Sequence, residues 1–176
     1  MSDAVPVQRR EVAPSDWVAE AEAARAEGFT FFDWLTAVDQ ADAVDAPGLD
    51  VVCHLLDAST PKSLRRMLIR TRVPEGDALA SITGVFRGAA WHERETHEMF
   101  GLGFEGFDDG TGRGLRPLLL PDGFEGTPLR KSFVLAARAS KQWPGAKEPG
   151  ESEHSKPTGR RRVSAPGVPD AEWGPR

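Results

Sequence analysis

The residues from Leu64 to Val73 constrain the fold of this chain more tightly than any other stretch, because two kinds of side chain alternate along them. Successive side chains of a β-strand point to opposite faces. One face would carry Met67, Ile69, Thr71 and Val73, and the other Arg66, Leu68, Arg70 and Arg72. A strand with one apolar face and one mostly charged face is typical of an antiparallel sheet that is covered on a single side.

Two earlier segments predict further strands of the same sheet. Residues 29–38 are rich in aromatic and β-branched side chains, and residues 49–56 form a second apolar run after a turn at 45–48. Together with the segment at 64–73, they predict a sheet of three or four strands.

Two helices are expected beside these strands. The first begins near Ser15 and ends at Gly28. The second begins after a cap at Asp77 and continues to a C-terminal cap at Gly101. Its apolar residues recur at helical spacing at Ile82, Val85, Phe86, Ala89 and Ala90. The sequence therefore predicts an α+β fold, a small mostly antiparallel sheet with helices on one face, plus an extended C-terminal tail.

Composition divides the chain into three parts. We expect a flexible N-terminus at residues 1–13, an α+β domain at 14–138 and an extended or disordered tail at 139–176. The tail holds six prolines and few aliphatic residues, too little apolar surface to offset its ordering entropy. Trp143 and Trp173 are unusual there. Either they order the tail on a partner subunit, or their presence is incidental.

Charge and hydropathy exclude several classes of protein. A net charge of -5 and a pI near 5.4 argue against a nucleic-acid partner. No run approaches the roughly 18 apolar residues of a membrane span, and no secretory signal is visible. The single cysteine, Cys53, forms no internal disulfide and holds no zinc or iron–sulfur cluster alone. These features fit a reduced, cytoplasmic compartment.

Familiar catalytic patterns are malformed in this sequence. His92 and His97 are five residues apart, whereas two zinc ligands on one helical face are four apart. Glu93 and His97 have that spacing, and they carry the remote alternative of a metal-dependent hydrolase. Cys53 and His54 are neighbours in a strand and would point to opposite faces, so they form no catalytic dyad.

Charged and aromatic residues concentrate between Trp91 and Phe100, and cations recur in the proline- and leucine-rich segments that follow. The later cations are Arg116, Arg130 and Lys131. Arginines beside aromatic anchors are the residue mix of protein–protein contacts. An interface between subunits and an internal loop network explain this pattern equally well.

The same region contains a set of motif residues in a fixed order: Trp91, Glu93, Arg94, Glu95, Glu98, Phe100, Gly101, Arg116, Pro128, Leu129, Arg130 and Lys131. In these residues and their spacing the chain resembles the 30-kDa (C-type) subunit family of respiratory complex I, the NADH:quinone oxidoreductase. The resemblance is firm over about residues 78–135 and reaches back to the first helix.

The resemblance implies a non-catalytic structural subunit of the peripheral arm, on the cytoplasmic side of the cell membrane. Members pack against the 49-kDa-type (D) and cluster-bearing (B) subunits and support electron transfer from NADH to quinone in a proton-translocating complex. The I-type ferredoxin-like subunit is a third candidate neighbour. FMN and iron–sulfur clusters would lie in partner subunits, with no cofactor, metal or catalytic residue in this chain. We expect ion pairs that fix the loops and the contact between subunits, formed by Arg94, Glu95, Arg116, Arg130 and Lys131.

The sequence departs from the family pattern in its loops. Residues 107–114 replace a shorter segment that contains a histidine, Thr127 replaces a histidine, Ser132 an aspartate, and His97 a common tyrosine. The related alternative is the equivalent subunit of a membrane-bound hydrogenase or an F420-linked complex. The identity of the quinone and proton pumping lie beyond what this sequence specifies.

Overall fold

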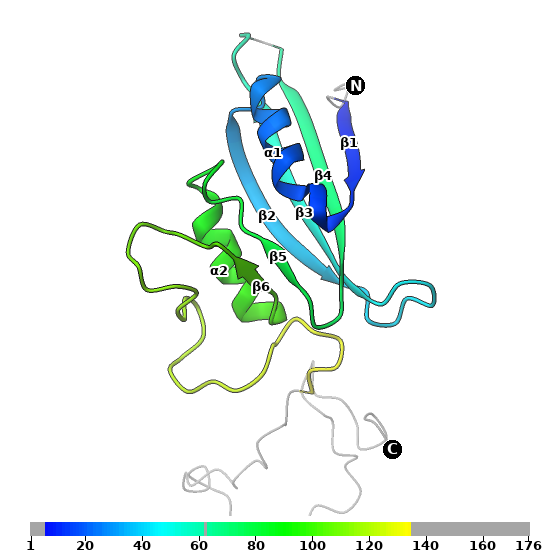
Figure 1. Cartoon of the computed structure of the whole chain (residues 1–176), viewed down its shortest axis with the longest axis vertical. Helices are drawn as coiled ribbons and strands as arrows, with labels where there is room; N and C mark the ends of the chain where they lie inside the picture. Colours follow the sequence, from blue (N-terminus) through cyan, green and yellow to red (C-terminus); the bar gives the residue numbers. More distant parts are fainter. Residues whose placement is uncertain (1–5, 62, 135–176) are drawn as a thin grey trace, which may run out of the picture. The chain divides into compact units, whose positions relative to one another are not determined.

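A computed structural model describes residues 6–61 and 63–134 of the chain. Four strands form one sheet in the order β1-β4-β3-β2 (Figure 1). These strands are β1 (Val7–Val12), β2 (Phe31–Asp39), β3 (Gly48–Asp57) and β4 (Arg65–Pro74). The pairs β2–β3 and β3–β4 are antiparallel, whereas β1 pairs parallel with β4.

The remaining elements lie outside this sheet. A short 3-10 helix η1 (Pro14–Asp16) leads into α1 (Trp17–Ala26). A two-stranded parallel sheet joins β5 (Ala78–Ala80) to β6 (Gly103–Glu105), with α2 (Ala89–Phe100) between them in the chain. The predicted α+β class, with a mostly antiparallel sheet and helices on one face, is confirmed.

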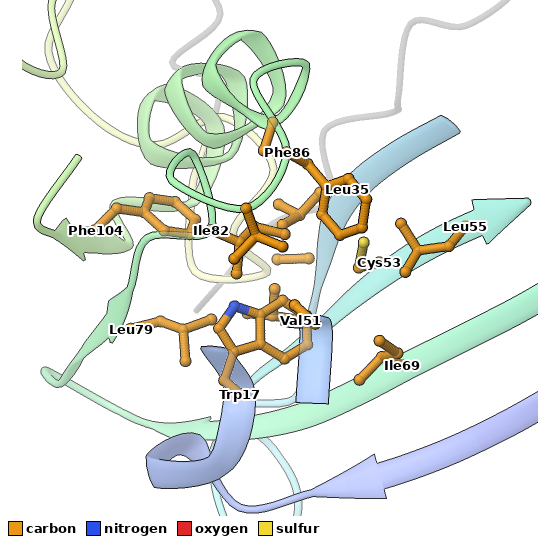
Figure 2. Close-up of a cluster of buried hydrophobic side chains, with 14 of the residues drawn as sticks. Trp17, Leu35, Val51, Cys53, Leu55, Ile69, Leu79, Ile82, Phe86 and Phe104 are labelled. Atoms are coloured by element: carbon orange, nitrogen blue, oxygen red, sulfur yellow. The ribbon is translucent and has the colours of Figure 1, made fainter. Parts of the chain in front are cut away.

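The core lies between one face of the four-stranded sheet and the helices. Met67, Ile69, Thr71 and Val73 are each at most 1% exposed, so the alternation predicted for this strand is confirmed. Figure 2 shows Trp17 of α1 and Phe86, which precedes α2, directed at the strand residues Leu35, Val51 and Cys53. Burial of such side chains stabilises the fold by roughly 1.5–3 kcal/mol each.

The N-terminal segment corrects one prediction. The first thirteen residues were expected to be flexible, but Val7–Val12 form β1 in parallel register with Arg66–Thr71. On its inner side Arg10 donates hydrogen bonds to Glu20 and Glu27, at 2.5 and 2.7 Å. Polar side chains had suggested a loose segment, but an edge strand is held by backbone pairing and keeps its charges in solvent.

The helix expected from Asp77 begins twelve residues later. Ala78–Ala80 form β5 instead, with Leu79 buried. Between β5 and α2 the chain makes successive turns, in which the amides of Val85 and Phe86 donate to the carbonyl of Ile82 at 3.0 and 2.8 Å. Such turns return apolar residues to the core every three or four positions, which reproduces a helical period without a continuous helix.

Several predictions lie outside the described residues. The tail at 139–176, with Trp143 and Trp173, falls there, and so do the first five residues. Within the described part of the chain, no helix has the length and apolar character needed to cross a membrane.

Candidate functional site

Glu93 connects α2 to the segment that follows β5. Its side chain is fully buried, and its two carboxylate oxygens accept hydrogen bonds from the Ile82 amide at 2.8 Å and the Ser81 hydroxyl at 2.6 Å. Burial raises the pKa of Glu93 to about 7, although these two donors oppose the shift. Glu93 therefore fixes the turn at residues 81–83 against the helix.

Two further charged residues of α2 hold a long irregular segment. Residues 106–134 form no helix or strand, and we call them the anchored loop. Arg94 donates to the carbonyls of Arg116 and Pro117, at 3.2 and 2.7 Å. The expected ion pair of Arg94 is thus replaced by bonds to loop carbonyls.

Glu98 binds the next residues of the anchored loop. Its carboxylate accepts hydrogen bonds from the amides of Leu118, Leu119 and Leu120, at 3.0, 2.7 and 3.1 Å. Partial burial acts to raise the pKa of Glu98, but the three amide donors outweigh it and hold the pKa below its usual range. Three N–H groups on one carboxylate form a strong charge-assisted contact.

The C-terminal end of α2 receives the last part of the anchored loop. Gly101 caps the helix with φ 77°, a left-handed conformation that favours glycine, and donates to the His97 carbonyl at 2.8 Å. The Leu129 amide donates to the Met99 carbonyl at 3.0 Å. Because these carbonyls belong to the last turn, the loop satisfies groups that a helix end otherwise leaves unpaired.

Arg130 and Lys131 join the anchored loop to the sheet. Arg130 forms ion pairs with Asp39, at 3.5 Å, and with Glu75. The Lys131 amide donates to Asp39 at 2.8 Å, and its ammonium donates to Asp42 at 2.6 Å. These contacts connect the loop to the end of β2 and to the turn between β4 and β5.

Arg116 makes a local contact within the anchored loop. It pairs with Asp109 and donates to the Thr111 hydroxyl at 3.2 Å. Hydrogen bonds from Thr111 and Arg116 lower the pKa of Asp109. This pair lies in and beside residues 107–114, the segment that departs from the family pattern, and closes that segment on itself.

The remaining predicted residues divide between core and surface. Phe100 is buried, Pro128 is half-buried, and Trp91 is 54% exposed. Glu95 lies 3.9 Å from His92 on the same helix. Trp91 therefore presents its ring to solvent instead of packing into the core.

The partners of the motif residues in this network could not be found from the sequence. Asp39 and Arg130 are separated by 91 positions, and Glu75 and Arg130 by 55. Ser81 and Asp109 are likewise ordinary polar residues in the sequence. Only the three-dimensional approach of distant segments gives them their roles.

The groups considered for chemistry are engaged in structural contacts. His97 Nδ1 lies 2.8 Å from the Leu102 carbonyl oxygen, and Glu93 is enclosed in the core. Cys53 is buried, and burial raises the pKa of its thiol well above the usual range. Among residues 6–61 and 63–134, no group of three His, Cys, Asp or Glu side chains could hold a metal ion.

Comparison with known proteins gives this network a family context. A model of the family described as "Respiratory-chain NADH dehydrogenase, 30 Kd subunit" matches residues 10–139. The chain belongs to this family. The anchoring residues of α2 and of the loop all lie within the matched range, and the resemblance inferred from the motif is confirmed.

Relatives from Mesorhizobium and Rhizobium are named as the C subunit of an NADH-quinone oxidoreductase. The protein from Mesorhizobium japonicum is 48% identical over 86 residues, which cover 49% of this chain and 39% of the relative. The second C subunit of Rhizobium meliloti is 38% identical over 120 residues, or 67% of this chain and 62% of the relative. The chain thus matches between 39% and 62% of the length of these two relatives.

Two solved structures share the fold of this 30-kDa-type chain. A trypsin-resistant fragment of Nqo5 aligns with a TM-score of 0.53 and 26% identity, over 62% of this chain and 86% of the fragment. A chain from the membrane-bound sulfane sulfur reductase, an archaeal respiratory membrane complex, aligns with a TM-score of 0.62 over 88% of both chains. At 20% identity the second likeness concerns the fold alone.

Proposed function

We propose that this chain is a structural subunit of the peripheral arm of an NADH:quinone oxidoreductase. It packs against the 49-kDa-type (D) and B-type subunits on the cytoplasmic side of the cell membrane, with the I-type subunit as a third neighbour. FMN and the iron–sulfur clusters lie in partner subunits. In this arrangement the chain supports electron transfer from NADH to quinone through shape and contact, with no reactive group of its own.

The single observation that carries this proposal is the use of the family motif as a set of anchors. The polar atoms of Glu93, Arg94 and Glu98 bind backbone groups, and the guanidinium of Arg130 pairs with internal carboxylates. A motif built for chemistry would leave such groups free to reach a substrate, whereas Glu98 and Arg130, which line two small pockets, are both held by internal partners. Here the motif gives one conformation to a loop that has no regular secondary structure.

The anchored conformation exposes apolar side chains beside the motif. Trp91, Leu119 and Leu129 are 54%, 52% and 55% exposed. The last two belong to residues whose amides bind α2 directly. Large exposed apolar side chains on a pre-ordered surface are typical of a protein contact. We call these three side chains the α2 docking face.

The test is recovery of the intact complex through a tag on a neighbouring subunit. Leu119→Asp should reduce the amount of this chain in the purified complex at least tenfold, because a charge would be buried at the contact. Val44→Asp is the matched control, since Val44 is 97% exposed in the loop between β2 and β3. Both variants should melt within about 2 °C of the unmodified chain in isolation, since exposed substitutions cost little.

Equal recovery of Leu119→Asp and Val44→Asp would contradict the α2 docking face. Turnover by the isolated chain, or a stoichiometric metal or flavin bound to it, would contradict the structural role. The names of the relatives favour an NADH-linked complex over the hydrogenase or F420-linked alternative. Neighbouring genes for the flavin and NADH subunits, rather than for a nickel–iron large subunit, would support the same choice.

A further inference from the structure

The second face of the four-stranded sheet is covered by no helix in the described part of the chain. Strand register sorts its side chains into rows that cross the sheet. The first two rows hold Phe31, Leu56, Arg66 and Val7, then Trp34, His54, Leu68 and Arg9. The other rows hold Thr36, Val52, Arg70 and Glu11, then Val38, Asp50 and Arg72. We call this surface the open sheet face.

The half of the open sheet face at Asp50 neutralises its own charges. Asp50 is 4% exposed and pairs with Arg72 and with Arg70, the latter at 3.7 Å. Arg70 also reaches Glu11 at 3.1 Å. With each guanidinium facing a carboxylate, this half offers little unsatisfied charge to a partner.

The half of the open sheet face at Phe31 differs from the half at Asp50, because its arginines lack carboxylate partners among the described residues and it exposes apolar side chains. Arg9 is exposed, and neither Arg9 nor Arg66 forms an ion pair with a carboxylate among residues 6–61 and 63–134. Arg66 donates instead to His54 Nε2 at 3.3 Å. Phe31 is 56% exposed, and Leu68 is half-buried in a neighbouring row.

A rigid aromatic support lies in the same half. Trp34 stacks on His54 with ring centroids 5.4 Å apart, and Asp33 fixes the histidine through a 2.7 Å contact to Nδ1. The imidazole, its carboxylate and the Arg66 guanidinium thus hold one another before any partner arrives. Pre-ordered aromatic groups beside arginine lower the entropy cost of association.

We propose that the half of the open sheet face formed by Phe31, Trp34, Leu68, Arg9 and Arg66 is a second docking surface, for an acidic segment of another subunit of the complex. The segment would place an apolar side chain near Phe31 and carboxylates against the two guanidinium groups. This inference rests on the proposed assembly of the chain into a larger complex.

A second copy of the chain fits this surface poorly. A two-fold contact would bring the same face, with the same two arginines, against itself. Like charges would then meet across the contact, and such juxtaposition is unfavourable. An acidic partner satisfies both guanidinium groups, so charge favours a different subunit.

A photo-crosslinking phenylalanine analogue at position 31, carried by the full chain in the assembled complex, tests the surface directly. Irradiation should cross-link position 31 to an acidic segment of another subunit, identified by mass spectrometry. The same analogue at Val38 is the control. Val38 lies on the same strand and face and is 47% exposed, but belongs to the self-neutralised half, so it should give at most one-fifth of that product.

Two charge variants provide an independent measurement. Phe31→Glu and Arg9→Glu should each lower recovery of the chain in the complex at least fivefold, whereas Val38→Glu should leave it unchanged. Thermal melting of each isolated variant controls for folding, and both positions are exposed.

Each contrary result overturns the proposal in a distinct way. A cross-link from position 31 to another part of the same chain, or to a second copy of it, would identify a different occupant. If position 31 gave no cross-link, the surface would face solvent in the complex. If the Phe31→Glu chain were fully recovered in the complex while the Leu119→Asp chain was lost from it, the second docking surface would be contradicted and the proposed function would stand. Full recovery of both variants would contradict the proposed docking altogether.

Discussion

Glu93 is an unusual residue to find in the core, because an ionised carboxylate there has lost its water. Two donors, from Ser81 and Ile82, compensate only in part, and burial keeps the pKa near 7. The residue thus gives precise attachment of α2 at a cost in stability when it is ionised. The pKa of the Cys53 thiol is raised mainly by burial, and the charge of Glu93 raises it further.

This cost makes the free energy of unfolding depend on pH. The pKa of Glu93 is higher in the folded chain than in the unfolded one, so the folded state binds more protons between about pH 4.5 and pH 7. Stability from this group is present below that window and is lost as pH rises through it, by on the order of 3 kcal/mol. Glu93→Gln, which never ionises, should abolish this component.

Urea unfolding of both chains at pH 5 and pH 8 measures the effect. The unmodified chain should lose more stability than Glu93→Gln between these two values, because carboxylates with lowered pKa, such as Asp57, titrate below this range. The Ser81 hydroxyl can rotate to accept from the new amide, so the variant should fold. Equal losses in the two chains would mean that Glu93 stays ionised without penalty.

Arg130 illustrates how a motif cation acts inside the chain. Its side chain is 14% exposed, and it faces Asp39, whose side chain is 4% exposed. Arg130→Ala would leave that carboxylate without its guanidinium, so the isolated chain should lose on the order of 2 kcal/mol. The melting temperature should fall by about 5–10 °C.

A matched substitution on the neighbouring cation separates buried from exposed charge. Lys131→Ala removes a pair whose two side chains are 51% and 68% exposed, so it should shift the melting temperature by at most about 2 °C. Similar shifts for the two variants would argue that Arg130 contributes only a surface pair. Arg130→Ala should also reduce assembly, through loss of the folded loop.

At the scale of elements, α2 organises a segment longer than itself. The helix has 12 residues, and the anchored loop that it holds at Arg94, Glu98 and Met99 runs from residue 106 to residue 134. A loop of this length without secondary structure depends on such individual contacts, so those that it makes with α2 control the local order of the loop more than the stability of the sheet.

Glu98→Gln should therefore open the anchored loop selectively. A neutral amide replaces the charge that three backbone amides share, and each bond to a charged acceptor is worth about 1.5–3 kcal/mol. We expect trypsin to cleave after Arg113 at least tenfold faster, with the melting temperature of the sheet nearly unchanged; Arg116 precedes Pro117 and is not a trypsin site. Glu95→Gln, on the same helix, should leave cleavage unchanged. A uniform loss of stability without faster cleavage would contradict this local role.

The helices and strands also show which structural features the sequence patterns predict correctly and which they do not. The alternation from Leu64 to Val73 identified β4 and its buried face, because few backbone conformations apart from a strand produce a period of two. Apolar spacing between Asp77 and Ala89 predicted a helix that is instead a strand and a series of turns. Spacing records which residues return to the core, and it does not record the backbone path between them.

The candidate site was found from the sequence as a set of residues and not as a set of contacts. The motif placed Glu93, Arg94 and Glu98 on one helix, which the structure confirms. Their partners are loop amides, loop carbonyls and Ser81, which no local pattern distinguishes from other polar groups. Such long-range partners can be identified only when the fold brings distant segments together.

At the scale of the whole described region, the sheet separates two surfaces of different character. One side carries the helices, the anchored loop and the α2 docking face. The other side carries the open sheet face, divided between self-neutralised and unpaired arginines. A subunit with two such surfaces can bridge two neighbours, which fits a structural role within a larger assembly.

The parallel pairing of β1 with β4 has a consequence for the order in which the chain acquires its structure. The strand at residues 7–12 precedes the other three strands of the sheet in the chain, yet β4, with which it pairs, ends about sixty residues later. Until then its backbone donors and acceptors face water or a chaperone. The first of the four strands in the chain therefore cannot pair before the last of them exists, and this long-range pairing must offset the entropy cost of closing the intervening chain.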